Sequence, residues 1–341
     1  MARATIEDVA EAAGVSVATV DRVLNGRAAV RPKTVERVEK AIRILNYQSD
    51  RLAARLARSK EYRFCFILPE GSNAFMTALG DAVREEALRM AQEKVVIDLR
   101  HTDVFAAEAL SATLETISDL YDGVAVVALD HPRVRESINA LCERGVAVAT
   151  LVSDVPGSQR THYVGIDNSA AGRTAATLMG NYLRGRKGKV GLIAGSLSLR
   201  DHVERQFGFE QVMLHEYPGL TLLPVREGRD DREIVQRVAA QLLADHPDLI
   251  GLYNVGAGTR GVVAALEATG RQKQVVYIAH ELTDESRRAL IDGTIDIVIN
   301  QDAGHEVRSA IRVLMSRADR SPIVKAMERI RIDVYVRDNI P

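Results

Sequence analysis

From Tyr62 onward the sequence alternates short apolar segments with longer segments that have helical spacing. The apolar segments read FCFILPE, VVIDLR, GVAVVAL, VAVATLV, YVGID, KVGLIAG, LIGLYNV, VVYIAHE and DIVIN. Regular alternation of strand and helix is typical of sheets whose parallel strands are joined by helical crossovers. This part of the chain is therefore predicted to be an α/β fold with doubly wound parallel sheets.

A different pattern fills the first 60 residues, where apolar residues recur at helical spacing. The stretch TIEDVAEAAGVSVATVDRVLNG predicts two short helices, capped by Thr5 and Ser16 and joined by a tight turn at Gly14. A third helix follows Pro32, a residue that suits a first helical turn. The residues expected to face inward are Ile6, Val9, Ala10, Ala13, Val20, Val23, Leu24, Val35, Val38, Ala41, Ile42 and Leu45. Three short helices with this turn fit a helix-turn-helix domain, which binds DNA.

The charge of the chain is distributed unevenly. Residues 1–60 carry 12 Lys and Arg against 7 Asp and Glu, a net charge of +5, whereas residues 61–341 carry 33 against 39, a net charge of −6. A basic head on an acidic body indicates that the head contacts a polyanion. No apolar run approaches the ~18 residues that cross a bilayer, and the start of the chain does not resemble a signal peptide. We therefore expect a cytoplasmic protein without membrane contact, in which Cys65 and Cys142 stay reduced.

Residues 49–60, SDRLAARLARSK, form a short basic segment between the head and the body. Ser49 or Asp50 can cap a helix whose apolar positions are 52, 53 and 56. A free peptide of this length is mostly unfolded in water, so the helix is expected only on a partner surface. The alternatives are a hinge that folds on DNA and an amphipathic linker that packs Leu56 against the protein.

The head also resembles a known family. GVSVATVDRVLNG, followed by VRPKTVERVEKAIRILNY, is similar to the head of the LacI family of bacterial repressors. In that family the second helix lies in the major groove, and a leucine of the hinge enters the minor groove. The resemblance implies a guanine contact by Arg22, apolar base contacts by Val17 and Ala18, and a wedge at Leu56. The implied DNA-binding residues are Thr5, Ser16, Val17, Ala18, Thr19, Arg22, Asn25, Tyr47, Ala53 and Leu56.

One position of the head departs from the family. Asp21 stands where the family usually has a serine, and a carboxylate close to phosphates is unfavourable. Either Asp21 pairs with a neighbouring arginine, or the operator is held differently.

Polar residues follow the predicted strands of the body at the points where the strands end. Doubly wound sheets bind their ligands at the carboxyl ends of strands. A polyol hydroxyl is both donor and acceptor, so its site needs carboxylate acceptors, a donor such as arginine, and amides that do both. The strand-end residues that fit are Asn73, Asp154, Asn254, Glu281 and Gln301, with Phe75 as a surface for the apolar face of a sugar.

The body resembles the periplasmic-binding-protein-like core of the same family in SNAFM, YVGIDNSAAG and HVERQFGF. The resemblance implies two lobes with a sugar site between them, approximately 61–163 plus 294–323 and 164–293 plus 324–341. The implied effector-binding residues are Ser72, Asn73, Phe75, Asp154, Arg205, Asn254, Glu281 and Gln301. Asp167 and Asn168 are expected to cap a helix. Ala74, Val255 and the sequence IAHE depart from the family pattern, so the ligand need not be that of a familiar member.

A competing interpretation comes from GAGTRG at 256–261. The motif has the G-x-G-x-x-G spacing of a dinucleotide site, follows a predicted strand, and has Glu281 twenty residues further on. An NAD-dependent sugar dehydrogenase is therefore an alternative. Against it, the motif lies deep in the chain, and His280, His305, Lys273 and Lys325 have no recognisable hydride-transfer context.

The sequence as a whole predicts a helix-turn-helix domain at 1–48, a hinge helix at 49–60 and a two-lobed effector-binding and dimerisation domain at 61–341. The expected function is that of a homodimeric repressor without enzymatic activity, cofactor or metal. It would bind a partly palindromic, double-stranded operator and respond to a sugar or polyol. Two alternatives stay open beside the dehydrogenase: a regulator that needs a corepressor, and a DNA-binding protein whose body only dimerises.

Overall fold

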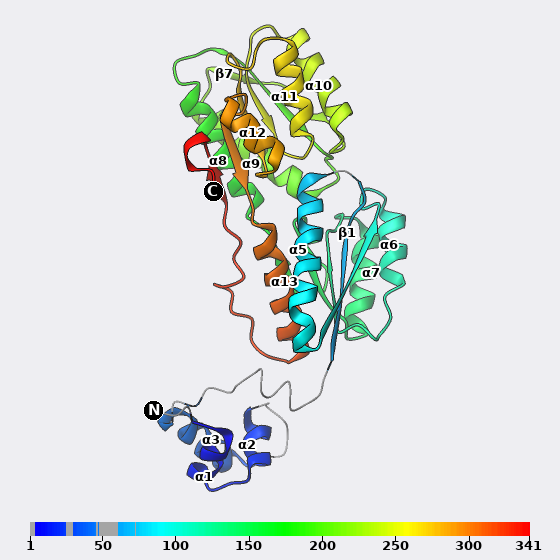
Figure 1. Ribbon diagram of the computed structural model, residues 1–341, viewed down its shortest axis with the longest axis vertical. Helices are drawn as coiled ribbons and strands as arrows, with labels where there is room; N and C mark the ends of the chain where they lie inside the picture. Colours follow the sequence, from blue (N-terminus) through cyan, green and yellow to red (C-terminus); the bar gives the residue numbers. More distant parts are fainter. Residues whose placement is uncertain (1–3, 25–29, 46, 48–60, 72) are drawn as a thin grey trace. The chain divides into compact units, whose positions relative to one another are not determined.

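The computed structural model describes residues 4–24, 30–45, 47, 61–71 and 73–341, with the side chain of residue 21 left out. The chain divides into two compact units, Met1–Glu61 and Tyr62–Pro341 (Figure 1). The division agrees with the change of sequence pattern near Tyr62. The predicted hinge at 49–60 and residue Ser72 lie outside the described residues.

The head consists of three helices, α1 (Ile6–Ala13), α2 (Val17–Leu24) and α3 (Pro32–Ile44). Thr5 caps α1 reciprocally with Asp8, and Gly14 ends the helix in the left-handed conformation with φ 58°. The buried core is Val9, Ala10, Ala13, Val20, Val38 and Ala41. Leu24 was predicted to face inward, but this last residue of α2 is 38% exposed.

The first sheet of the body has the order β2-β1-β3-β4-β5, and all its described pairs are parallel. Its strands are β1 (Tyr62–Pro69), β2 (Val95–Thr102), β3 (Gly123–Val126), β4 (Ala147–Leu151) and β5 (His162–Val164). Helices α5 (Ala74–Met90) and α13 (Ala303–Ala318) lie side by side on one face, and α6 (Ala107–Glu115) and α7 (Pro132–Glu143) cover the other (Figure 1).

The second sheet has the order β12-β11-β10-β9-β6-β7, with β8 also paired to β6. Its strands are β6 (Gly188–Ala194), β7 (Leu220–Leu222), β8 (Arg226–Glu227), β9 (Leu249–Asn254), β10 (Val276–His280), β11 (Ile297–Asn300) and β12 (Asp333–Tyr335). β12 runs antiparallel to β11, which departs from the all-parallel expectation.

The helices of the second lobe lie on both faces of its sheet. One face carries α8 (Asn168–Tyr182) and α9 (Arg200–Glu216). The other carries α10 (Arg232–Asp245), α11 (Thr259–Ala268) and α12 (Asp284–Asp292). Short 3₁₀ turns lie at Ala91–Glu93 and Arg337–Asn339. No helix in the described ranges is both long and apolar enough to span a bilayer.

The structure corrects one predicted lobe boundary. Residues 294–323 were assigned to the first lobe, but β11 pairs with β10 and β12 in the second sheet. The chain enters the first lobe only afterwards, with α13 packed on β3 and β4. The sequence DIVIN is apolar throughout and would suit a central strand of either sheet, so its pattern alone did not identify its partners.

Candidate functional site

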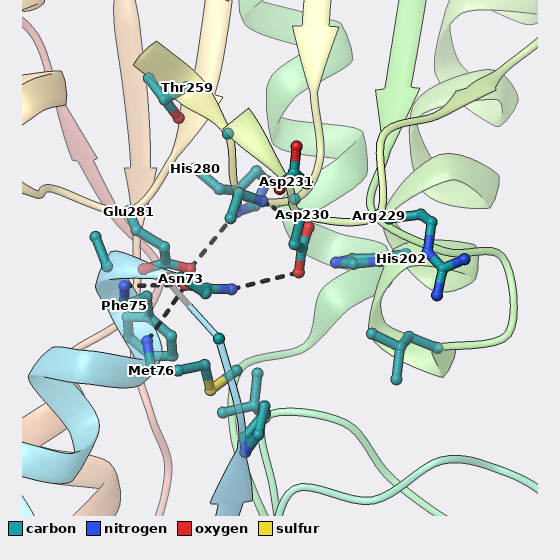
Figure 2. A pocket seen from close by; sticks show the side chains of 18 of the residues that line it. Asn73, Phe75, Met76, His202, Arg229, Asp230, Asp231, Thr259, His280 and Glu281 are labelled. Carbon is teal, nitrogen blue, oxygen red and sulfur yellow. Dashed lines mark hydrogen bonds and ion pairs between the residues drawn. The ribbon is translucent and has the colours of Figure 1, made fainter. Parts of the chain in front are cut away.

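A cavity of about 540 Å³ lies where the carboxyl ends of the strands of the two sheets face each other. From the first lobe it is lined by the start of α5 and by the segment after β4. From the second lobe it is lined by the first turns of α9 and by the loops that follow β8, β9, β10 and β11. Five predicted effector-binding residues line it, namely Asn73, Phe75, Arg205, Glu281 and Gln301. Figure 2 shows Asn73, Phe75 and Glu281 among them.

The start of α5 presents Asn73 and Phe75 to the cavity. Asn73 caps the helix, because its Oδ1 accepts hydrogen bonds from the backbone N–H groups of Phe75 and Met76 at 3.0 and 3.3 Å. The Nδ2 of Asn73 donates to Oδ2 of Asp230 in the other lobe at 3.3 Å (Figure 2). Phe75 is 7% exposed and belongs to the core, so most of its ring forms the wall of the cavity.

Arg205 projects from α9 and is 3% exposed. Its Nε donates to Oδ1 of Asn168 at 2.8 Å, and its Nη1 donates to the carbonyl of Val255 at 2.8 Å. Nη2 has no hydrogen-bond partner in the described part of the chain. Helix α9 can place Arg205 here because Gly172 and Gly208 allow α8 and α9 to approach closely, where an added Cβ would lie about 2 Å from backbone carbonyl oxygens.

The structure divides the roles expected for Asp167 and Asn168. Asp167 caps α8, as predicted, by accepting from the N–H of Ala170 at 2.8 Å. Asn168 is buried at the first residue of the helix, where it accepts from Arg205 and donates to the hydroxyl of Tyr163 at 3.0 Å. Asn168 therefore fixes the orientation of the guanidinium.

Glu281 follows β10 in the left-handed conformation, with φ 66°. Its Oε1 accepts from Nε2 of Gln301 at 2.9 Å, and its Oε2 accepts from the backbone N–H of Gln301 at 3.3 Å. Burial, opposed in part by the positive charge of Arg205, raises the pKa of Glu281 to about 7. Burial and the nearby Glu281 raise the pKa of the fully buried Glu306 well above its usual value. Burial, with the charge of Arg205, also holds the pKa of His280 well below its usual value.

Two predicted residues have other roles. Asn254 lies behind the cavity wall, where its Nδ2 donates to the carbonyls of Gly256 and Ala257 at 3.1 and 3.0 Å. Asp154 does not line the cavity, because its carboxylate is held by Arg160 and by the hydroxyl of Thr150. Although burial opposes it, this pairing keeps the pKa of Asp154 below its usual value. The prediction of a ligand contact for Asp154 therefore finds no support in its geometry.

Five buried polar atoms of residues that line the cavity have no hydrogen-bond partner among the residues that the structure describes. They are Ser153 Oγ, Asp201 Oδ1, Arg205 Nη2, His280 Nδ1 and Gln301 Oε1. Buried polar groups in folded proteins are nearly always paired, so a concentration of unpaired donors and acceptors indicates a site for a polar ligand. Among the residues that the structure describes, no cluster of three or more His, Cys, Asp or Glu side chains could hold a metal ion.

Most of the predicted DNA-binding residues that the structure describes are exposed on the surface of the head, whereas Thr19 and Tyr47 are half-buried. Val17 is 40% exposed, and Ala18 and Arg22 are exposed on the same helix. Ser16 caps α2 by accepting from the N–H of Thr19 at 3.2 Å. Thr5 is exposed at the start of α1, and Tyr47 is half-buried against the core of the head. Asn25, Ala53 and Leu56 lie outside the described residues, as does the side chain of Asp21.

Comparison with known families assigns both units. Residues 5–50 match the family of bacterial regulatory proteins named lacI, and residues 64–321 match a periplasmic binding protein domain. The chain belongs to the LacI family of DNA-binding transcriptional regulators. It is 25% identical over 303 residues to the ribose operon repressor of Halalkalibacterium halodurans, covering 85% of this chain and 80% of that protein.

Two further proteins are similar to this LacI-family chain. The ribitol operon repressor of Klebsiella aerogenes is 27% identical over 189 residues, which cover 54% of this chain and 67% of that protein. A solute-binding protein of an ABC transporter from Burkholderia graminis, solved in complex with D-arabinose, superposes with a TM-score of 0.74 at 23% identity. That match covers 82% of this chain and 96% of the other, and it shows the fold.

The family assignment excludes the dehydrogenase alternative, and the geometry of the GAGTRG loop gives a physical reason. The backbone N–H of Ala257, in this loop, donates to Oδ1 of Asp230 at 2.9 Å. A Cβ at Gly256 would lie 2.5 Å from the same oxygen, and one at Gly261 would lie 2.4 Å from the backbone of α10. The glycines therefore serve close packing, and a carboxylate already occupies the position that a pyrophosphate would need.

The sequence did not identify Asp201, His202 or Asp230 as cavity residues. Asp230 precedes Asp231, the residue that caps α10, so in the sequence both acids look like helix-capping residues. The Asp230 side chain reaches the cavity because Arg229 and Asp230 both have positive φ, 52° and 55°. A left-handed pair of non-glycine residues has no signal in the sequence.

Proposed function

We propose that this LacI-family regulator is a repressor that binds an operator through α2 and senses a sugar or polyol in the cavity between its lobes. The observation that carries the proposal is the set of five buried, unpartnered polar atoms around the cavity. These atoms include donors and acceptors, which is what a polyhydroxylated ligand requires. The similarity to repressors of ribose and ribitol operons supports the same class of effector.

Arg205, Glu281, Gln301 and Asn73 are the proposed polar contacts of the effector, with Phe75 as an apolar wall. The Nη2 amino group of Arg205 carries two N–H donors that have no partner among the described residues, and Asn168 fixes the direction of the guanidinium. Gln301 likewise has a carbonyl oxygen without a partner in the described part of the chain. Ordering these side chains before the ligand arrives reduces the entropy that binding must overcome. Ser72 and Asp154 are not needed for this arrangement.

For the head, we propose base contacts by Val17, Ala18 and Arg22. An exposed arginine on the recognition helix can make a bidentate contact to guanine, and small apolar side chains can contact a thymine methyl. The hypothesis for the hinge, with Ala53 and Leu56 at the minor groove, concerns residues outside the described ones. Leu56→Ala tests it, because unchanged operator affinity would rule out the wedge.

Two contacts between the lobes depend on how the lobes are oriented, and the orientation is what a bound effector would change. Asn73 in the first lobe donates to Asp230 in the second, and Arg200 Nη1 in the second lobe lies 3.4 Å from Oδ2 of Asp130 in the first. A ligand that binds one arrangement of the lobes more tightly than another shifts their relative orientation. In a homodimer on a partly palindromic operator, that shift changes how both heads reach their half-sites.

The first experiment is a thermal-shift screen of the purified chain against sugars, sugar alcohols, purines and NAD(P)H. We expect stabilisation by at least one sugar or polyol, because a ligand that binds only the folded state raises its stability. The stabilising compound is then added to an operator-binding assay, in which loss of affinity identifies an inducer and gain identifies a corepressor. Stabilisation by none of the sugars or polyols would instead favour a body that only dimerises.

A further inference from the structure

We infer that the effector carries a positively charged amine as well as hydroxyl groups, as an amino sugar or an amino alditol does. This inference rests on the proposed function, because it specifies the ligand of the same cavity. It begins from the charges that line the inner cavity. The residues that line the cavity include four arginines, of which only Arg205 is buried, and seven acids, namely Glu70, Asp201, Asp230, Asp231, Glu233, Glu281 and Glu285. Three of these acids, Asp201, Asp230 and Glu281, define the inner cavity, with Arg205 beside them.

None of these three carboxyl groups forms an ion pair with a lysine or arginine of the described chain. The ionic neighbours recorded for Asp201 and Glu281 are the histidines His202 and His280, at 3.6 and 4.0 Å. Arg205 donates to neutral acceptors, namely an amide oxygen and a backbone carbonyl. Buried charge is costly unless it is paired, so the carboxylates of Asp201 and Asp230 leave negative charge at the cavity without a lysine or arginine partner among the described residues. Glu281 adds less charge near neutral pH, because its pKa is raised to about 7.

Asp154 provides the internal comparison. It lies at the end of β4, close in sequence to the cavity residue Ser153, but Arg160 pairs with it directly. The protein thus neutralises Asp154, and at the rim of the cavity Arg260 pairs with Glu285. By contrast, the three carboxyl groups of the inner cavity have no lysine or arginine ion-pair partner among the described residues. This contrast indicates that the ligand supplies the missing charge.

The Asp230 side chain occupies space that two glycines, Gly195 and Gly256, leave open. A Cβ added at Gly195 would lie 2.1 Å from Asp230 Oδ1, and one at Gly256 would lie 2.5 Å from it. The same two positions approach the ring of His202, within 2.5 Å of Cε1 and 3.2 Å of Nε2. Asp230 and His202 are therefore neighbours, as Figure 2 shows, and Asp201 adjoins His202.

These contacts place the amine beside Asp230, on the side of the cavity that holds Asp201 and His202. Asp201 is 4% exposed and its Oδ1 has no partner, so it can accept from an ammonium group. An ammonium has three donors and a full charge, whereas a hydroxyl has one donor and no charge. Arg205, Gln301 and Ser153 then serve the hydroxyl groups. A divalent cation is not favoured, because no metal-ligand cluster lies within the described residues.

The test compares matched pairs of ligands by isothermal titration calorimetry on the full chain near neutral pH. The pairs are D-glucosamine and D-glucose, D-galactosamine and D-galactose, and D-glucamine and D-glucitol. We expect at least one amine to bind at least tenfold more tightly than its neutral partner. Asp230→Asn should reduce that ratio to threefold or less.

Asp231→Asn is the matched control, because it removes the same charge from the adjacent residue. Asp231 caps α10 by accepting from Glu233 and Ile234, and asparagine caps a helix equally well. The amine preference should therefore survive in Asp231→Asn, and both variants should unfold at temperatures close to that of the parent chain.

The outcomes separate this inference from the proposed function. Equal or tighter binding of a neutral partner would overturn the amine inference and leave a sugar-responsive repressor in place. An amine preference that persists in Asp230→Asn would overturn the assignment of Asp230. Binding by neither the amines nor their neutral partners would count against both the inference and the proposed function.

Discussion

The head and the body prepare their binding surfaces in opposite ways. In the head, the proposed DNA contacts Val17, Ala18 and Arg22 are exposed, and the core behind them is complete without them. In the body, the proposed ligand contacts Arg205 and Gln301 are 3% and 2% exposed and are bonded into the surrounding structure. In the head, the side chains proposed to recognise DNA are therefore not those that form the core. In the body, the side chains proposed to bind the ligand also belong to the internal hydrogen-bond network.

The largest effect is expected where the helices of the body approach most closely. Gly208→Ala would place a Cβ 2.1 Å from the carbonyl oxygen of Ser169 on α8. Because backbone must move, the body should lose about 3 kcal/mol or more of unfolding free energy. Urea denaturation measures the loss. Gly219→Ala is the control, since no atom lies within 4 Å of its added Cβ. If the two variants are equally stable, the close packing of α8 on α9 does not determine the stability of the body.

The second-largest effect is expected for Arg205, which is hydrogen-bonded inside the body and is also proposed to bind the ligand. Arg205→Lys keeps the positive charge but cannot donate at once to Asn168, Val255 and a ligand. We expect ligand affinity to fall by about 2–3 kcal/mol, with operator affinity retained. Calorimetry and an operator-binding assay provide the two readouts. Loss of both activities would indicate misfolding, and unchanged ligand affinity would remove Arg205 from the site.

In the head, Arg22→Ala should leave folding and ligand binding unchanged, because the side chain is exposed. Operator affinity should fall by about 1–3 kcal/mol, and discrimination at one base pair should relax. Binding to a set of operators with single base-pair changes measures this. A uniform loss over all sequences would instead make Arg22 a phosphate contact. Lys40→Ala, on the exposed surface of α3, is the control for charge.

A smaller effect of pH distinguishes the body from the head. The pKa of Glu281 is raised to about 7 in the folded chain, above the value of 4.5 expected in the unfolded chain. The folded state then holds its proton more tightly, so this contribution to stability is complete below the unfolded pKa and is lost as pH rises through the folded pKa. Between about pH 5 and pH 7 the parent chain should lose about 2 kcal/mol of stability relative to Glu281→Gln.

Urea unfolding of the two chains at each pH gives the comparison. Glutamine can still accept from Gln301 through its carbonyl oxygen, so the variant changes the titration and keeps that hydrogen bond. A difference between the chains that does not change with pH would show that Glu281 does not titrate in this range.

The contrast between the head and the body also explains which features could be predicted from the sequence. The caps at Thr5 and Ser16 and the turn at Gly14 depend on neighbours within a few residues, and their sequence patterns were sufficient. Helical spacing also identified the buried residues of the head, although Leu24 was an exception. Arg205, Glu281 and Gln301 followed from strand ends and family resemblance, and they do line the cavity.

The errors in the body come from contacts that are distant in sequence or depend on backbone conformation. Asp154 follows a strand, as a ligand contact would, but Arg160 lies after the turn that follows β4 and forms an ion pair with it. Asp230 reaches the cavity through two left-handed residues and through space left by Gly195 and Gly256. The assignment of β11 to the second sheet likewise depends on pairing that an all-apolar strand does not specify.

The central claim is that occupancy of the cavity in the body changes the affinity of the head for DNA. The most direct measurement is the operator affinity of the parent chain and of Arg205→Lys, each with and without a saturating concentration of the sugar or polyol found in the thermal-shift screen. The account predicts a change of about 5- to 150-fold in the parent chain and no change in the variant. An identical operator affinity with and without bound ligand in the parent chain would contradict it.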